Sequence, residues 1–256
     1  MVRGLDIFQK YFAAYPDNYV IIGGTACDII IEKKDFIPRA TKDIDIILVV
    51  EALNPDFVRM FWQFIIDGKY EQKQQNSDER KYYRFIKPEN TEFPFQIELF
   101  ARNPDLLDFD EQSYLTPIPV DDNLTSLSAI LMDDDYYHFM LKHSMLDNGL
   151  HLANIGALIC LKAKAFLEIA ESIATGSKED SKHLRKHKGD VFRLAVMLTA
   201  NDLFELPVKM KAHMQNFVDV VAEEMPDNAI FKEMGMGGIS VESVLKQIIK
   251  SFELNE

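Results

Sequence analysis

Two aspartates, Asp43 and Asp45, interrupt a run of β-branched residues in the segment DIDIILVV, residues 43–50. The Ile and Val residues of this run predict a buried strand. Residues two apart in a strand point to the same face, so the two carboxylates would be aimed at one point while Ile44 and Ile46 point the other way. Neighbouring anions in an apolar strand persist only at a solvated rim or around a cation, because burying an unpaired charge costs several kcal/mol. The spacing therefore predicts a site for a hard divalent cation.

A second candidate is the sequence IIGGT, residues 21–25, which predicts a buried strand that breaks at two glycines and continues directly into a helix. Gly23 and Gly24 would let the backbone approach a ligand closely, and the helix N-terminus with the Thr25 hydroxyl would attract an anion. The alternative for this pair of glycines is a tight turn without a ligand.

A third carboxylate, Glu98, lies in the apolar segment FPFQIELF, where a lone acid is again out of place. Glu98 would complete a metal site with Asp43 and Asp45. The alternative is an edge-strand glutamate that faces water.

Two basic segments follow in the second half of the chain. In ICLKAKAFLEI, Lys162 and Lys164 fall on nearly opposite sides of the predicted helix, so at most one of them can point into a site. In SKHLRKHK, His183 and His187 have the spacing of a zinc-binding helix, but the surrounding cations disfavour a metal ion there. This basic run is either a solvated face or a contact for RNA or phosphate.

In this combination and order, the residues resemble the nucleotidyltransferase superfamily. Its pattern is a strand, Gly-Gly or Gly-Ser at the head of a helix, a strand carrying Asp-x-Asp, and a third acid on a neighbouring strand. Here the pattern reads GGT at 23–25, DID at 43–45 and the glutamate of QIEL at 98. The whole chain is similar to the AbiEii-type nucleotidyltransferases, the toxin halves of bacterial abortive-infection and toxin–antitoxin systems. The stretches that carry this similarity are VIIGGTACDIII, RATKDIDIIL, LTPIPVDDNLTSLSAIL, LICLKAKAFLEI and KHKGDVFRL.

The resemblance implies an enzyme that uses Mg²⁺ to move a nucleoside monophosphate from an NTP to a hydroxyl acceptor. The end of a tRNA is the candidate acceptor, and a cognate antitoxin is the candidate protein partner. Asp43 and Asp45 would hold one Mg²⁺ on the triphosphate and, with Glu98, a second that activates the attacking hydroxyl. The resemblance also implies that Gly23, Gly24 and Thr25 bind the β- and γ-phosphates. It implies that Lys162 contacts the nucleotide phosphates. Asp190 would orient that lysine or the acceptor.

Two alternatives stay open. A nucleotidyltransferase fold could serve as a binding module without turnover; this is supported by Gly24, which stands where the family usually has serine, and opposed by the three carboxylates. The same chemistry could act on a small molecule such as an antibiotic. The net charge favours a small acceptor, whereas the basic helix favours RNA.

The elements that must position these residues divide the chain into two parts. Residues 1–152 alternate short apolar strands with helical patterns and predict an α/β (α+β) catalytic domain, a mixed sheet with flanking helices. Within it, Asp147-Asn148-Gly149 predicts a hairpin turn, and Asp133–Asp135 a solvated turn before a strand. Residues 153–256 have helical periodicity and predict a helical bundle that completes the active-site cleft.

Composition agrees with a globular chain and excludes several classes of protein. The 256 residues are 47% apolar, which is ample for a core. Because there is no signal-peptide run and no apolar stretch of about 20 residues, we expect a cytoplasmic protein without membrane contact. Cys27 and Cys160 are too isolated for a disulfide framework or a thiolate metal site. With 41 acidic and 28 basic side chains, the net charge of -13 argues against broad nucleic-acid binding but leaves room for a local basic patch.

Overall fold

The computed structural model describes residues 2–72, 83–102, 115–117, 128–176 and 181–255. The chain divides into two compact units: unit 1 comprises Met1–Asp28 and Ala40–Ala153, and unit 2 comprises Ile29–Arg39 and Asn154–Glu256. The division at residues 153 and 154 lies one residue from the predicted one. The assignment of residues 29–39 to the C-terminal unit was not expected. Part of one segment that carries the family resemblance, residues 118–127, lies outside the described residues.

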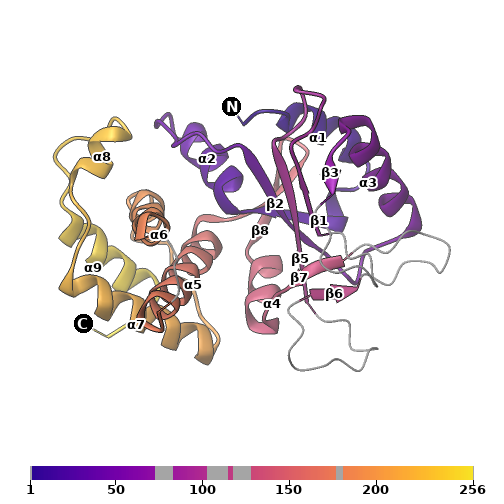
Figure 1. Ribbon diagram of the computed structural model, residues 1–256. Coiled ribbons are helices and arrows are strands. Elements are labelled where there is room, and N and C mark those ends of the chain that lie inside the picture. Colours follow the sequence, from indigo (N-terminus) through magenta and orange to yellow (C-terminus); the bar gives the residue numbers. More distant parts are fainter. Residues whose placement is uncertain (1, 73–82, 103–114, 118–127, 177–180, 256) are drawn as a thin grey trace. The chain divides into compact units, whose positions relative to one another are not determined.

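Unit 1 is built on a mixed β-sheet. Its strands are β1 (Tyr19–Ile22), β2 (Asp43–Leu48), β3 (Glu71–Gln72), β4 (Arg84–Ile86), β5 (Gln96–Ala101), β6 (Leu115–Pro117), β7 (Ser128–Leu131), β8 (Ser144–Asp147) and β9 (Leu150–Ala153). They are ordered β3-β4-β5-β2-β1-β9-β8, and β7 pairs with both β5 and β6 (Figure 1). At the centre, β2 is antiparallel to β1 and parallel to β5. The expected mixed sheet with flanking helices is confirmed.

Helices α1 (Leu5–Phe12) and α3 (Pro55–Gly68) lie side by side against this sheet (Figure 1). Both present aromatic rings to each other and to the strands; the contacting rings are Phe8, Phe12, Tyr19, Phe57, Phe61, Phe64 and Phe85. Helix α3 begins where its sequence predicts, because the Asn54 side chain accepts a hydrogen bond from the Phe57 amide at 2.9 Å and Pro55 occupies the first turn. This aromatic layer covers one face of the sheet, where Tyr19 of β1 and Phe85 of β4 meet the helices.

At Asp133–Asp135, the structure differs from the sequence prediction. Asp133–Asp135 is not a turn before a strand, because helix α4 (Asp134–Lys142) starts there. The Asp133 side chain accepts a hydrogen bond from the Asp135 amide at 3.1 Å and caps the helix. The predicted hairpin is confirmed: β8 and β9 pair around Asn148 and Gly149, which have φ angles of 49° and 79°.

Unit 2 is a helical bundle. Its helices are α5 (Ile155–Ala174), α6 (Ser181–Ala195), α7 (Val208–Glu223), α8 (Ala229–Glu233) and α9 (Val241–Ser251). Helix α5 begins at Asn154, whose side chain accepts a hydrogen bond from the Ala157 amide at 3.0 Å, and it packs against α6 and α7. The helix α2 (Gly23–Lys33) contains the division between the units, since its last residues belong to unit 2. None of the described helices is both long enough and apolar enough to cross a membrane.

Candidate functional site

Asp43 and Asp45 lie on the central strand β2 with the alternation that the sequence predicts. Both are partly exposed, whereas Ile44 and Ile46 are fully buried. In the parallel pair of β2 and β5, Asp45 is opposite Glu98. Directly opposed residues of neighbouring strands share a face of the sheet. The sheet therefore brings the three predicted carboxylates to one face.

The first residue of α2, Gly23, lies directly against the Asp45 carboxylate. Gly23 has φ 68°, and a Cβ built on it would be 2.0 Å from Asp45 Oδ2. A Cβ on Gly24 would be 2.5 Å from Thr41 Oγ1. No side chain fits at either position without displacing one of these groups. The glycine pair is thus required by close packing between the start of α2 and the β2 segment.

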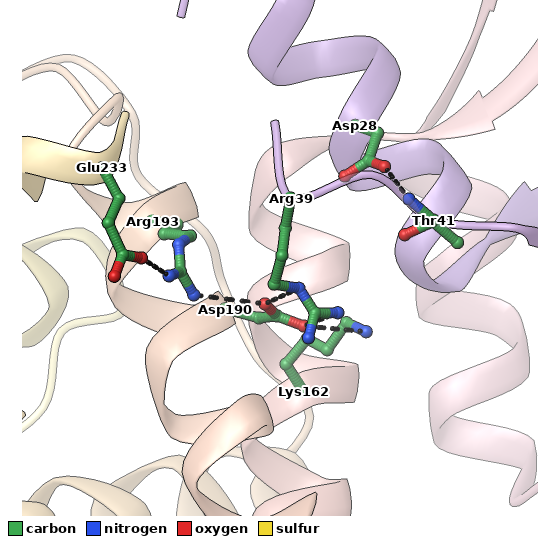
Figure 2. Close-up of polar contacts among 7 residues, drawn as sticks. All are labelled: Asp28, Arg39, Thr41, Lys162, Asp190, Arg193 and Glu233. Atoms are coloured by element: carbon green, nitrogen blue, oxygen red, sulfur yellow. Dashed lines mark hydrogen bonds and ion pairs between the residues drawn. The ribbon is translucent and has the colours of Figure 1, made fainter. Parts of the chain in front are cut away.

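Two hydrogen bonds fasten α2 to the start of β2. The Thr25 hydroxyl donates to the main-chain carbonyl of Asp43 at 2.5 Å, and the Asp28 carboxylate accepts from the Thr41 amide at 2.6 Å, as Figure 2 shows for Asp28 and Thr41. Thr25 is completely buried and Asp28 nearly so. The Thr25 side chain, expected at a phosphate, therefore holds the strand that carries the aspartates.

Glu98 is engaged by Arg84 of the adjacent strand β4. Arg84 is directly opposite Glu98 in the antiparallel pair, and its Nε donates to Glu98 Oε1 at 2.6 Å while Nη2 forms a second contact with the same oxygen. Within the described residues, no group of three or more His, Cys, Asp or Glu side chains is arranged to hold a metal ion. Both Arg84 contacts are to Oε1, so a metal role of Glu98 would fall to Oε2 or would require the ion pair with Arg84 to open.

In unit 2, Asp190 of α6 is the centre of a cluster of cations (Figure 2). Asp190 is 5% exposed and Lys162 is 7% exposed. The Lys162 Nζ lies 3.4 Å from Asp190 Oδ2, the Arg39 Nε 3.5 Å from Oδ1 and the Arg193 Nη1 3.7 Å from Oδ1. Arg193 also donates to Glu233 at 2.7 Å. One buried carboxylate thus orients three cationic side chains, including the lysine that the family resemblance assigns to phosphate binding.

Lys162 and Lys164 separate as the helical register predicts. Lys162 is buried against Asp190, whereas Lys164 is partly exposed and forms an ion pair with Glu168 one turn along α5.

His187, beside this cluster, is held in its neutral form. Burial, together with the nearby cations Lys162, Lys186 and Arg39, lowers the pKa of His187 to about 4, while Asp190 opposes this shift. Its Nδ1 is buried and has no hydrogen-bond partner among the described residues. His183 and His187 form no metal group there.

Four residues of these clusters were not among the predicted site residues: Asp28, Arg39, Arg84 and Arg193. Asp28 and Arg84 are single charges within apolar segments, TACDIII and YYRFI, which is the same signal that identified Glu98. Arg39 gave no such signal, because its partner Asp190 is 151 residues away.

Comparison with known proteins adds little to this geometry. No family model matches the sequence, and no curated protein matches it. Among solved structures, the chain is similar to the Megavirus polyadenylate synthase, with 12% identity and a TM-score of 0.37 over 86% of this chain. The matched region spans 36% of that protein's chain. A similarity of this size carries no argument about fold or activity.

Proposed function

We propose that the chain is a Mg²⁺-dependent nucleotidyltransferase that moves a nucleoside monophosphate from an NTP to a hydroxyl acceptor. The observation that carries this proposal is the pair of partly exposed carboxylates, Asp43 and Asp45, on one face of β2 with Asp45 against the glycine that starts α2. It is supported by the order of motifs along the chain, which resembles that of the nucleotidyltransferase superfamily.

The donor set fits the proposed metal ion. Mg²⁺ prefers oxygen ligands and is bound in proteins by one or two carboxylates together with substrate phosphates and water. Asp43 and Asp45 supply such oxygens at a partly exposed position, and they would hold Mg²⁺. When bound, Mg²⁺ would neutralise the triphosphate and the charge that develops on the transferred phosphoryl group.

The other residues of unit 1 would orient the nucleotide. The first-turn amides of α2, at Gly23, Gly24 and Thr25, have no partner within the helix and would donate to phosphate oxygens. The side chains of Thr25 and Asp28 would hold β2 in place against this turn. Glu98 would act as a further metal ligand or as the base for the acceptor hydroxyl through Oε2, or through both oxygens once its ion pair with Arg84 opens.

Lys162 and Asp190 have proposed roles that follow from the family resemblance. Lys162 would contact nucleotide phosphates, and Asp190 would keep its ammonium group oriented when no nucleotide is bound. A buried lysine needs such a partner, because the cost of desolvating its charge is otherwise uncompensated.

The proposal is tested by incubating the protein with each α-³²P-labelled NTP, Mg²⁺ and total cell RNA. Asp45→Asn should reduce label transfer by at least about a hundredfold, since even residues that only support metal ligands often contribute 10- to 100-fold. Asp6→Asn, at an exposed acid of unit 1, is the matched control and should transfer label normally. Equal transfer by wild type and Asp45→Asn would refute the proposal.

A binding module without turnover is the second candidate, favoured by the ion pair of Glu98 with Arg84 and by Gly24 in place of serine. It predicts that the wild type binds a fluorescent NTP analogue but transfers no label to RNA or to small hydroxyl acceptors. Transfer to small acceptors alone would instead identify a small-molecule nucleotidyltransferase.

We further propose, from the family resemblance, that the protein is the toxin of a toxin–antitoxin pair and that tRNA is its acceptor. Expression without a partner should then arrest bacterial growth, because modified tRNA ends cannot support translation. Asp43→Asn and Asp45→Asn should be harmless at matched protein levels. Arrest that persists in both variants would contradict toxicity through nucleotidyl transfer.

A further inference from the structure

Unit 2 contains a groove of about 670 Å³ whose lining is strongly basic. This volume is within the usual range of ligand sites. The lining includes six cationic side chains, Arg39, Lys182, Arg185, Lys186, Lys188 and Arg193. Its three acidic residues are Glu224, Asp227 and Glu233. With histidine neutral, the lining carries a net charge of +3 in a chain whose net charge is -13.

Three cations of this groove, Lys188, Arg193 and Arg39, are held by polar contacts within unit 2. Lys188 is buried, and its Nζ donates to the main-chain carbonyl of Glu224 at 2.7 Å. Arg193 donates to Glu233 at 2.7 Å, and Arg39 belongs to the cation cluster described above. Because acids of unit 2 already orient these side chains, a ligand would not have to restrict them on binding.

Basic side chains also form a stripe along one face of α6. Lys182, Arg185 and Lys186 are exposed. Lys182, Lys186, Gly189 and Arg193 follow each other at intervals of three or four residues, which places them on one side of the helix over about 16 Å. Gly189 is buried within this stripe, and the Arg193 guanidinium lies close over it, since a Cβ there would be 3.0 Å from Arg193 Nη1.

A long basic stripe matches a linear polyanion better than a compact phosphate ligand. The lining also includes Met225, Pro226 and Ile230, from the same segment as its three acids, and these side chains offer apolar surface to ribose or base faces. We propose that this groove binds the phosphodiester backbone of a single RNA strand and so docks the acceptor. The choice of RNA as the polymer rests on the proposed function, whereas the groove and its charge do not.

The test is fluorescence anisotropy of a short labelled single-stranded RNA with the full-length protein, without NTP or Mg²⁺. The double variant Lys182→Glu/Lys186→Glu should weaken binding at least about tenfold at low salt. Between about 50 and 200 mM salt it should also reduce the slope of log affinity against log salt by about 1.4, because each phosphate contact on a single strand contributes about 0.7. The control is Lys246→Glu/Lys250→Glu on α9, two exposed lysines with the same spacing in the same unit. It makes the same change in net charge and should alter affinity by less than about twofold.

Three results would overturn the inference: no RNA binding by the wild type at low salt, an equal loss of affinity in both double variants, or displacement of RNA by tripolyphosphate as effectively as by unlabelled RNA at equal charge. The assay is independent of the proposed transfer reaction. Asp45→Asn should bind the RNA normally while losing label transfer, so failure of one proposal is distinguishable from failure of the other.

Discussion

The two units both place carboxylates in apolar surroundings, but they do so with opposite electrostatics. In unit 1, Asp43, Asp45 and Glu98 share one face of the sheet, and among the described contacts Arg84 engages Glu98. In unit 2, the single carboxylate of Asp190 is surrounded by three cations. The second arrangement buries one anion among cations and is costly to break, whereas the first gathers three acids beside one arginine, two of them partly exposed, which suits a site that takes a cation.

The largest expected effect is a difference in the free energy of unfolding between a variant of Asp190 and a variant of Asp45. Asp190→Ala should lower the free energy of unfolding by about 3–5 kcal/mol, because it removes the buried partner of Lys162. Asp45→Ala should change it by less than about 1 kcal/mol, since Asp45 is partly exposed and lies beside another carboxylate, that of Glu98. Urea unfolding of both variants measures the difference. Similar losses in the two variants would show that the aspartates of unit 1 are structural as well.

A smaller effect is expected where Gly23 meets Asp45. Gly23→Ala should destabilise the protein by about 2–3 kcal/mol, because a left-handed backbone costs an alanine about 1–2 kcal/mol and the new Cβ would also displace the Asp45 carboxylate. Gly235→Ala is the control. Gly235 also has positive φ, at 83°, but nothing lies within 4 Å of its Cβ position, so only the backbone term applies. Thermal unfolding compares the two, and label transfer should be lost in Gly23→Ala alone.

Acid should weaken unit 2 through His187. Its pKa is lowered from 6.5 to about 4 by burial and by neighbouring cations. As the pH falls from about 6.5 towards 4, the unfolded chain binds the proton first, so stability is lost in this interval and is unaffected above it. With allowance for the partly exposed ring, the loss is about 1–2 kcal/mol. Urea unfolding at about pH 6.5 and pH 4 measures this loss of stability, which should be absent in His187→Gln. The same pH dependence in wild type and His187→Gln would contradict the attribution of the loss to His187.

The smallest effect concerns the second lysine of α5. Lys164→Ala should cost about 0.3–0.5 kcal/mol, the usual contribution of an exposed i,i+4 ion pair, and should leave NTP binding unchanged. Lys162→Ala should weaken NTP binding, measured by titration with a fluorescent analogue. Equal effects of the two variants on NTP affinity would refute the proposed role of Lys162.

The fold was largely predictable because its main signals are local. Strand β2 is specified by the alternation of DIDIILVV, and the β8–β9 hairpin by its Asn-Gly turn. The spacing of apolar residues after residue 154 specifies the helices of unit 2. Helix α4 was missed, because a run of three aspartates is typical both of a solvated turn and of a helix N-terminus. The assignment of residues 29–39 to unit 2 depends on contacts made far along the sequence, such as the hydrogen bond from the Ile37 amide to the Met234 carbonyl at 3.3 Å.

The candidate site was predictable to the extent that it depends on unusual residue types in apolar segments. Asp43, Asp45 and Glu98 were found in this way and share a face. The role of Thr25 was less predictable, because a threonine after two glycines can donate to a ligand or to a neighbouring strand with equal chemistry. The sequence alone could not show that Arg84 engages Glu98, since strand register decides which side chains meet.

Unit 2 is built from two separate stretches of the chain, and this affects the order in which parts of the protein can fold during synthesis. During synthesis, Arg39 leaves the ribosome 151 residues before Asp190, and the second segment of unit 1, Ala40–Ala153, is made in between. Domains generally fold as units during translation, so residues 29–39 must wait, with their unit 2 contacts unmade, until α6 and then α8 have been translated. Helix α2 would then be completed in two stages. Its first turn, which carries the glycines, would form with unit 1, and its last residues would settle only when the helical bundle assembles.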